Sequence, residues 1–385
     1  MMKTLTIFCR VVDNYGDIGI CWRIARQFAH EHDLQVQLWV DDLISFRRIC
    51  PEVNTEAADQ MVQDVRIRHW AHQALEFADE DISDVVIEFF ACDIPPAYIP
   101  MMVQRQPQPV WINLEGLTAE DWVEGCHTLP SPHPQFPITK YFFFPGFNQR
   151  TGGLIYEPAL KPARERFLLD QSDRDFLRSL SAGDDELAMF RVSLFCYPHA
   201  PVTEMLQAFA GGEREVLCFV PEGVASDAVT AFCGQALQAG DCIRQGALTL
   251  RCLPFIPQTD YDKLLWSCDL NLVRGEDSFV RAQLAGKPFL WHIYPQDNNL
   301  HHKKLKAFLQ IYCPQHPLLR DMMLGWNHAS AQVPDWSVLW PQLLQTFPAM
   351  QASAEDWLQQ IHDSGDMCSQ LLLFCGSKTG NSGQK

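Results

Sequence analysis

Short apolar runs alternate along the chain with amphipathic stretches of helical period. The first half contains five runs typical of buried strands, at residues 5–12, 36–42, 65–70, 84–90 and 109–115, and its clearest helical pattern spans 19–30. The second half contains five more runs, at 189–197, 215–221, 248–255, 269–273 and 288–293. Helical stretches separate these later runs, at 201–210, 226–239, 260–267 and 278–285. Strands that alternate with helices and are apolar on both faces favour parallel sheets, so the pattern predicts an α/β protein with two Rossmann-like domains.

The segment between the two series has a different composition. Residues 131–153 are rich in Pro, Gly and aromatic side chains, and a charged helical stretch follows at 163–180. This change places the domain junction within 170–187. The predicted divisions are an N-terminal domain (1–175), a C-terminal domain (186–350), a helix that packs back on the first domain (353–375) and a disordered tail (376–385).

Charge and cysteine usage narrow the class of protein. The formal net charge of -17 argues against binding to nucleic acid or to an anionic membrane, because both attract basic surfaces. The 14 cysteines form no CxxC pair and no Cys/His cluster at zinc spacing. No signal-peptide pattern opens the chain, and no apolar run approaches the roughly 20 residues of a membrane span. We therefore expect a cytoplasmic protein with reduced thiols.

Two Rossmann-like domains that face a cleft would bind ligands at the C-terminal ends of both sheets. This arrangement is typical of GT-B glycosyltransferases, but also of dehydrogenases and some sugar-phosphate epimerases. The first strand-to-helix turn lacks the GxGxxG pattern of a dinucleotide site, which disfavours a dehydrogenase.

The segment "LNLVRGEDSFVRAQLAGKPFLWHIYPQDNNLHHKKL" (270–305) is the best candidate for a nucleotide-sugar site. A strand ends at Val273 and a helix begins near Ser278, so backbone N–H groups would point at a diphosphate. Glu276 could accept hydrogen bonds from ribose hydroxyls, whereas Asp277 could equally serve as a helix cap.

Upstream strand ends add three candidates for recognition of the base. Phe255 could stack on it and Gln258 could contact its edge, although a core role for Phe255 is equally compatible with the pattern. Tyr197, at the end of another predicted strand, is the third candidate.

The first strand-to-helix turn, "VVDNYGDIGICWR" (11–23), contains two glycines but also Asp13 and Asp17. Two carboxylates would repel a phosphate, so this turn is not predicted to hold one. A structural alternative is that Asp17 caps the following helix.

Together with "LVRGEDSFVRAQLAGKPFLWHIYPQDNN" (272–299), this turn resembles the EarP family, bacterial protein-arginine rhamnosyltransferases that modify elongation factor P. The similarity extends to "WVDD" (39–42), "DVVIEFFACDIP" (84–95) and "INLEGLTAEDW" (112–122), and covers nearly the whole chain apart from the tail. The resemblance implies a GT-B fold and dTDP-β-L-rhamnose as donor. It also implies transfer with inversion to an arginine on a loop of the N-terminal domain of elongation factor P, which activates that factor.

The resemblance also assigns roles to residues. It places Tyr197, Phe255 and Gln258 around the base, and Glu276, Asp277 and Ser278 around ribose and diphosphate. In the first domain it marks Asp13 and Asp17 as essential carboxylates. On chemical grounds we expect Asp17 to be the general base and Asp13 to orient the acceptor arginine, since a guanidinium is a poor nucleophile until it is bound and deprotonated.

Three further expectations complete the predicted site. Glu276 is counted with the catalytic carboxylates, and Gly16 and Glu115 are expected on the acceptor side. No metal is expected, because a helix N-terminus and an arginine can support the departing diphosphate.

Two other classes stay open. One is a nucleotide-sugar enzyme, an epimerase or a glycosyltransferase, that acts on a non-protein acceptor. The other is a binding protein on a degenerate GT-B scaffold, which the intact pair of acidic residues disfavours.

Overall fold

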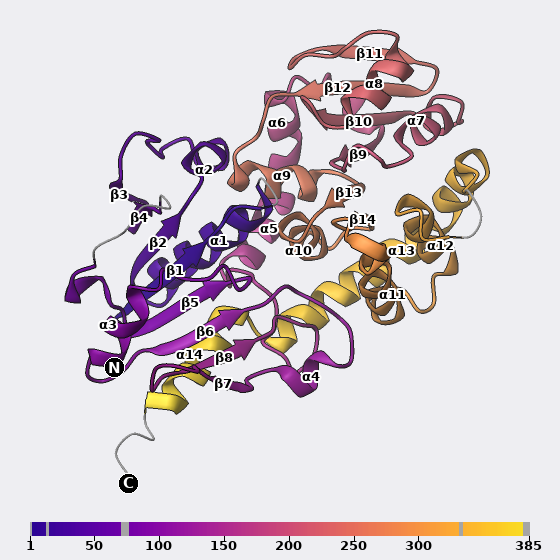
Figure 1. Cartoon of the computed structure of the whole chain (residues 1–385). Coiled ribbons are helices and arrows are strands. Elements are labelled where there is room, and N and C mark those ends of the chain that lie inside the picture. Colours follow the sequence, from indigo (N-terminus) through magenta and orange to yellow (C-terminus); the bar gives the residue numbers. More distant parts are fainter. Residues whose placement is uncertain (1, 13–14, 71–76, 331–333, 380–385) are drawn as a thin grey trace. The chain divides into compact units, whose positions relative to one another are not determined.

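The computed structural model describes residues 2–12, 15–70, 77–330 and 334–379 (Figure 1). The chain forms two compact units, Met1–Pro158 with Ile361–Lys385, and Ala159–Gln360. Each unit is built around its own mostly parallel sheet, which confirms the predicted α/β class.

The first unit contains a sheet of order β3-β4-β2-β1-β5-β6-β8-β7. Its strands are β1 (Thr4–Cys9), β2 (Gln35–Val40), β3 (Asp59–Val62), β4 (Val65–His69), β5 (Val85–Phe89), β6 (Val110–Leu114), β7 (Pro130–Pro132) and β8 (Thr139–Phe143). The inner strands pair in parallel, and the edge strands β3 and β7 pair antiparallel with β4 and β8. The sequence pattern missed these two edge strands because they are short and mostly exposed, and it also missed β8, whose side chains are mostly half-buried.

Helices cover both faces of this sheet. They are α1 (Gly16–Glu31), α2 (Leu43–Ile49), α3 (Tyr98–Gln104), α4 (Val123–Cys126) and α14 (Met367–Thr379). Alternation along β1 explains the two layers: Leu5 and Ile7 pack in one cluster with residues of α1 and α14, whereas Phe8 packs in another with residues of α3.

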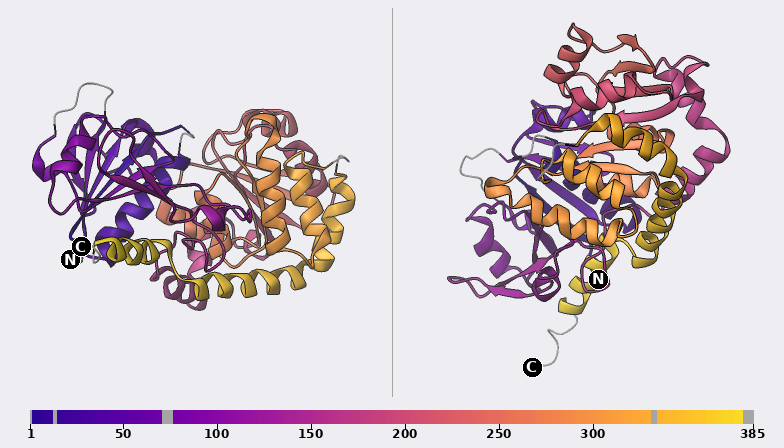
Figure 2. Two further views of the ribbon diagram at one scale, coloured as in Figure 1. Left: turned by 60° about the horizontal axis from the view of Figure 1, so that its bottom comes forward. Right: turned by 90° about the vertical axis from the view of Figure 1, so that its right-hand side faces the viewer.

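The C-terminal segment joins the core of this first unit. The sequence predicts one helix over 353–375, whereas the structure has α13 (Trp336–Ser364) and α14, separated at Gly365 with φ +80°. Met367 and Leu371 of α14 are fully buried in the cluster that also contains residues of β1. Figure 2 (left) shows α14, drawn in yellow, beside the N-terminal elements of the first unit. Residues 376–379, expected in a disordered tail, end α14, and 380–385 lie outside the described residues.

The second unit contains a sheet of order β11-β12-β10-β9-β13-β14. Its strands are β9 (Phe190–Leu194), β10 (Val216–Pro221), β11 (Cys242–Gln245), β12 (Leu248–Leu253), β13 (Leu270–Arg274) and β14 (Phe289–His292). All pairs are parallel except the one between β11 and β12.

One helix of the second unit is shorter than predicted. The helices of this unit are α5 (Leu160–Leu169), α6 (Ser172–Ser179), α7 (Val202–Ala210), α8 (Ser226–Cys233), α9 (Gln258–Ser267), α10 (Asp277–Leu284), α11 (His301–Tyr312), α12 (Pro317–Trp326) and most of α13. The helix predicted over 226–239 ends at Cys233 because Gly234 adopts φ +74°.

The division between the two units precedes α5, whereas the sequence places the junction within 170–187. Leu177 of α6 packs with Phe219 and Leu253 of the second sheet, so α6 is part of the second unit.

Candidate functional site

The turn after β1 positions Asp17 in the first turn of α1. This helix begins at Gly16, three residues before the predicted start, and Tyr15 is its N-cap residue. The Asp17 side chain is 6% exposed, and its Oδ2 accepts the backbone N–H of Val12 at 2.7 Å. Asp17 is therefore not the N-cap residue; it ties the preceding loop to the helix. Asp13 lies outside the described residues.

The neighbouring acidic pair Asp41–Asp42 supports the backbone. Asp41 Oδ1 accepts the N–H of Val11 at 2.8 Å, next to the contact made by Asp17. Asp42 is the N-cap of α2, and hydrogen bonds from Ile44 and Ser45 outweigh its partial burial and lower its pKa. The backbone of Val11 and Val12, just after β1, thus donates to two carboxylates, those of Asp41 and Asp17.

Glu115 lies at the C-terminal end of β6. The amide Nδ2 of buried Asn113 donates to Glu115 Oε1 at 2.5 Å, and Asn113 Oδ1 accepts the N–H of Ala91. In the sheet only β5 separates β6 from β1. Glu115 and the Asp17 turn therefore follow the C-terminal ends of parallel strands, at one edge of the first unit's sheet.

In the second unit, Glu276 is the N-cap residue of α10. Gly275 adopts φ +63° between β13 and the helix, and its carbonyl accepts Nε1–H of Trp291 at 2.6 Å. The Glu276 side chain makes no capping hydrogen bond to α10. Its Oε2 lies 3.7 Å from Nζ of Lys304, with 16% of the side chain exposed.

Asp277 and Ser278 are the first two residues of α10. Asp277 Oδ2 accepts Nε2–H of Gln258 at 3.2 Å, which brings two predicted donor residues together across the ends of β12 and β13. The Ser278 hydroxyl bonds the main chain of Arg274 through both N–H and C=O. The hydroxyl of Ser278 is thus engaged locally.

Aromatic side chains surround Arg274 at the same sheet edge. Its guanidinium carbon lies 4.8 Å from the ring centroid of Tyr197 and 4.3 Å from that of Phe195, and Nη1 donates to Cys196 O. Phe255 is 43% exposed, so it is a surface side chain and not a core residue. Gln258, the first residue of α9, is buried.

Sequence reasoning missed His292 and Lys304. His292 is fully buried at the end of β14, and its Nδ1 accepts the N–H of Tyr197 at 3.2 Å, so it positions the main chain of a predicted donor residue. The sequence signal was available, since "WHI" ends a predicted strand and "HHKK" follows the next loop. Without the fold, nothing in the sequence distinguished these two residues from the other histidines and lysines.

His292 should make stability fall in mild acid. Burial, and next the neighbouring His199, lowers its pKa to about 3, against about 6.5 in an unfolded chain. As the pH falls, the unfolded state takes up the proton first, so the free energy of unfolding declines below pH 6.5. We expect this residue to remove about 1 kcal/mol between pH 6.5 and 5.5, measured by urea unfolding. His292→Asn should lack this contribution; an identical pH dependence in both proteins would refute it.

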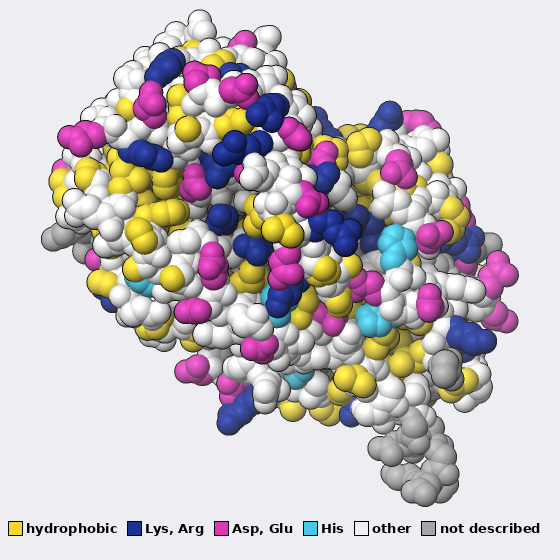
Figure 3. Space-filling model, turned by 180° about the vertical axis from the view of Figure 1, so that it is seen from behind, with side chains coloured by type: hydrophobic (Ala, Val, Ile, Leu, Met, Phe, Trp, Pro, Cys, Tyr) yellow, Lys and Arg dark blue, Asp and Glu magenta, His cyan; other side chains and the backbone are white. Residues whose placement is uncertain are grey.

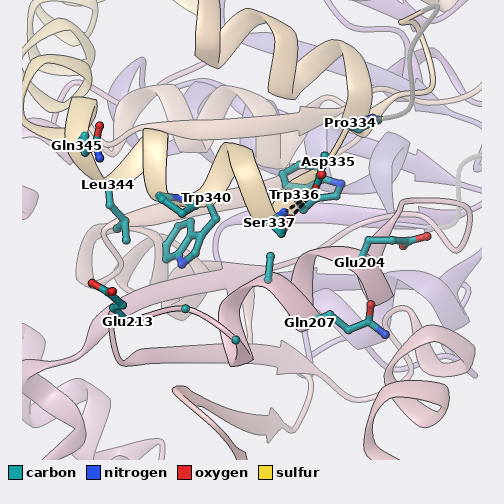
Figure 4. A pocket seen from close by; sticks show the side chains of 14 residues that line it. Glu204, Gln207, Glu213, Pro334, Asp335, Trp336, Ser337, Trp340, Leu344 and Gln345 are labelled. Carbon is teal, nitrogen blue, oxygen red and sulfur yellow. Dashed lines mark hydrogen bonds between the residues drawn. The ribbon is translucent and has the colours of Figure 1, made fainter.

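A cavity of about 970 Å³ lies elsewhere in the second unit (Figure 4). It is lined by residues of α7, the Gly211–Gly212 turn and the start of α13, including Glu213, Trp336 and Trp340. None of the predicted donor residues lines it. We therefore do not assign the donor to this cavity.

On the face shown in Figure 3, acidic and basic side chains are interspersed. Within the described ranges, no group of three or more His, Cys, Asp or Glu side chains could hold a metal ion. In the same part of the chain, no helix is long and apolar enough to cross a membrane.

Comparison with known proteins gives a consistent result. Residues 5–376 match the model of a family described as elongation factor P (EF-P) rhamnosyltransferase EarP. The chain is 44% identical over 377 residues to the protein-arginine rhamnosyltransferase of Pseudomonas putida, covering 97% of this chain and 99% of that one. The corresponding protein of Pseudomonas aeruginosa is 42% identical over 380 residues, with the same coverage.

Solved structures agree with the sequence comparison. A structure described as the basis for EarP-mediated arginine glycosylation of translation elongation factor EF-P matches with a TM-score of 0.66 and 31% identity, covering 96% of this chain and 98% of that one. Apo UGT2 of Phytolacca americana matches with a TM-score of 0.51 at 10% identity, covering 98% and 99%, which shows the fold alone. The fold is that of the GT-B glycosyltransferases.

Proposed function

The chain belongs to the EarP family of EF-P rhamnosyltransferases, and on that premise we propose how its residues carry out the transfer. As a member of the family it is a protein-arginine rhamnosyltransferase whose acceptor is EF-P. The donor is dTDP-β-L-rhamnose. Transfer inverts the anomeric centre, forms an α-rhamnosyl-arginine on a loop of the N-terminal domain of EF-P, and activates the factor. Because the acceptor is a translation factor, the reaction takes place in the cytoplasm.

One observation carries the acceptor assignment: the turn after β1 presents a buried carboxylate, Asp17, where a nucleotide-binding fold would cradle a phosphate. A carboxylate repels phosphate but attracts a guanidinium, with which it forms charge-assisted hydrogen bonds. The bond from Val12 N–H holds the Asp17 side chain in one orientation. The turn therefore suits a cationic acceptor.

The roles on the acceptor side follow from the chemistry of arginine. A guanidinium has a pKa above about 12 and no free lone pair, so it must be oriented and must lose a proton as the new C–N bond forms. Asp17 accepts that proton as general base, and Asp13 orients the guanidinium. Gly16 and Glu115 contribute to the acceptor side, with Asn113 holding the Glu115 carboxylate.

The donor binds at the C-terminal edge of the second unit's sheet. Tyr197, Phe255 and Gln258 contact the base; exposed Phe255 offers a stacking face and buried Gln258 an amide. Glu276 accepts a hydrogen bond from the 3′-hydroxyl, which is the one free hydroxyl of the deoxyribose in dTDP, and Asp277 lies beside it. Glu276 also counts among the catalytic carboxylates. Since the Ser278 hydroxyl is engaged by Arg274, its contribution to the diphosphate is the backbone N–H at the start of α10.

The departing dTDP needs no metal in this proposal. The N-terminus of α10 and the guanidinium of Arg274 supply preorganised positive charge where negative charge develops on the diphosphate. The fixed position of Arg274, stacked on two aromatic rings and bonded to Cys196 O, supports this role.

Intact mass spectrometry of EF-P tests the proposal. Incubation with this protein and dTDP-β-L-rhamnose should add one deoxyhexose to one arginine, in the presence of EDTA as well as without it. EF-P with its acceptor arginine replaced by lysine is the matched control and should gain no mass. Unchanged EF-P mass after prolonged incubation would contradict the proposal, and loss of transfer with EDTA would contradict its metal-independent form.

A further inference from the structure

A carboxylate at the start of α10 conflicts with the proposed diphosphate site. Glu276 is the N-cap residue of that helix, yet its side chain makes no capping bond. An anion at this point would repel a diphosphate, and its side chain would lose rotamer entropy on binding deoxyribose. A partner that holds the carboxylate would remove part of both penalties.

Lys304 on α11 is such a partner. Its Nζ lies 3.7 Å from Glu276 Oε2, and 23% of its side chain is exposed. The separation is longer than a hydrogen bond, so Lys304 acts through charge. Partial burial of both side chains makes that attraction stronger than on an open surface.

Both sides of this ion pair are anchored. The start of α11 is fixed by His301, whose Nδ1 accepts the N–H of Gln296 at 3.0 Å, and by His302, whose Nε2 lies 3.1 Å from Asn327 O. The turn that carries Glu276 is fixed by the bond from Trp291 to Gly275. Because the two backbones are held, the ammonium group stays within reach of the carboxylate.

We propose that Lys304 is a positioning residue of the donor site, which holds the Glu276 carboxylate ready for the donor. The inference rests on the proposed function, in which Glu276 binds the nucleotide part of dTDP-rhamnose. Lys304 contributes through Glu276 and not by a contact of its own with the diphosphate. Its neighbour Lys303 on the same helix is exposed and provides a matched control.

A double-mutant cycle measured by calorimetry with dTDP tests this role. Lys304→Met should weaken dTDP binding about three- to tenfold. This loss lies between the one expected on removal of an exposed ion pair and the one expected on removal of a buried charge-assisted contact. Lys304→Arg should restore most of the affinity, and Lys303→Met should bind as the unmodified protein does. In a Glu276→Gln background, Lys304→Met should cause little further loss, because the group it positions has lost its charge.

The outcomes separate this inference from the proposed function. Normal dTDP binding by Lys304→Met would overturn the inference alone, and so would an equal loss in the Glu276→Gln background, which would indicate a direct contact with phosphate. If the unmodified protein bound no dTDP, the donor assignment would fall and the inference with it. Lys304→Gln serves as a second neutral variant, with thermal unfolding to verify that each protein is folded.

Discussion

Asp17→Asn should abolish transfer while leaving the protein folded and able to bind donor. The asparagine Oδ1 can still accept the N–H of Val12, so the loop keeps its anchor. The amide cannot take up a proton or pair with a guanidinium as an anion. Loss of a general base costs about 10²–10⁴ in rate, and the lost ionic contact adds to that. The rate of rhamnose transfer to EF-P, followed by mass spectrometry, measures the effect.

Asp42→Asn is the matched control for this variant. Asp42 caps α2, and asparagine caps a helix about as well as aspartate, so both stability and transfer should survive. Asp13→Asn should also impair transfer, mainly by misplacing the acceptor arginine. An Asp17→Asn protein that modifies EF-P at a normal rate would refute Asp17 as the base.

Glu276→Ala should weaken the binding of dTDP-rhamnose and of dTDP alike. The lost hydrogen bond goes to the nucleotide part that both ligands share. A charge-assisted contact is worth about 1.5–3 kcal/mol, so affinity should fall roughly 10- to 150-fold by calorimetry. A loss confined to dTDP-rhamnose would instead point to a contact with the rhamnose ring.

Glu213→Ala is the control for the removal of a carboxylate from the second unit. Glu213 is exposed and lines the cavity beside Trp340 (Figure 4). None of the predicted donor residues lines this cavity. Its replacement should leave the affinity for dTDP unchanged. If both variants bound equally well, Glu276 would have no part in donor binding.

The alternation of apolar runs and helical stretches was enough to predict the inner strands of both sheets except β8, which lies in the segment rich in Pro, Gly and aromatic residues. The run "VLCFV" in β10 is buried on both faces, and that burial is visible in the sequence as unbroken apolar character. Edge strands β3, β7 and β11 escaped prediction, because a strand paired on one side carries exposed polar residues and loses this signal.

For the candidate site, the sequence predicted the local turns but not the surroundings of every side chain. Motifs close in sequence identified the turn around Asp17 and the start of α10, since a strand-to-helix turn is a local feature. Whether Phe255 lies in the core or on the surface could not be decided from its spacing, because strand ends carry no periodicity. Its exposed fraction of 43% decided it.

By itself, the sequence determined the α/β class, the inner strands other than β8, and the two strand-to-helix turns at Asp17 and Glu276, because these depend on neighbouring residues. Only the tertiary structure decided which distant side chains meet. Gln258 bonds Asp277, His292 holds the main chain of Tyr197, and Lys304 reaches Glu276. These partners are joined by strand order and helix packing, so their contact depends on how the sheet assembles and leaves no pattern along the chain.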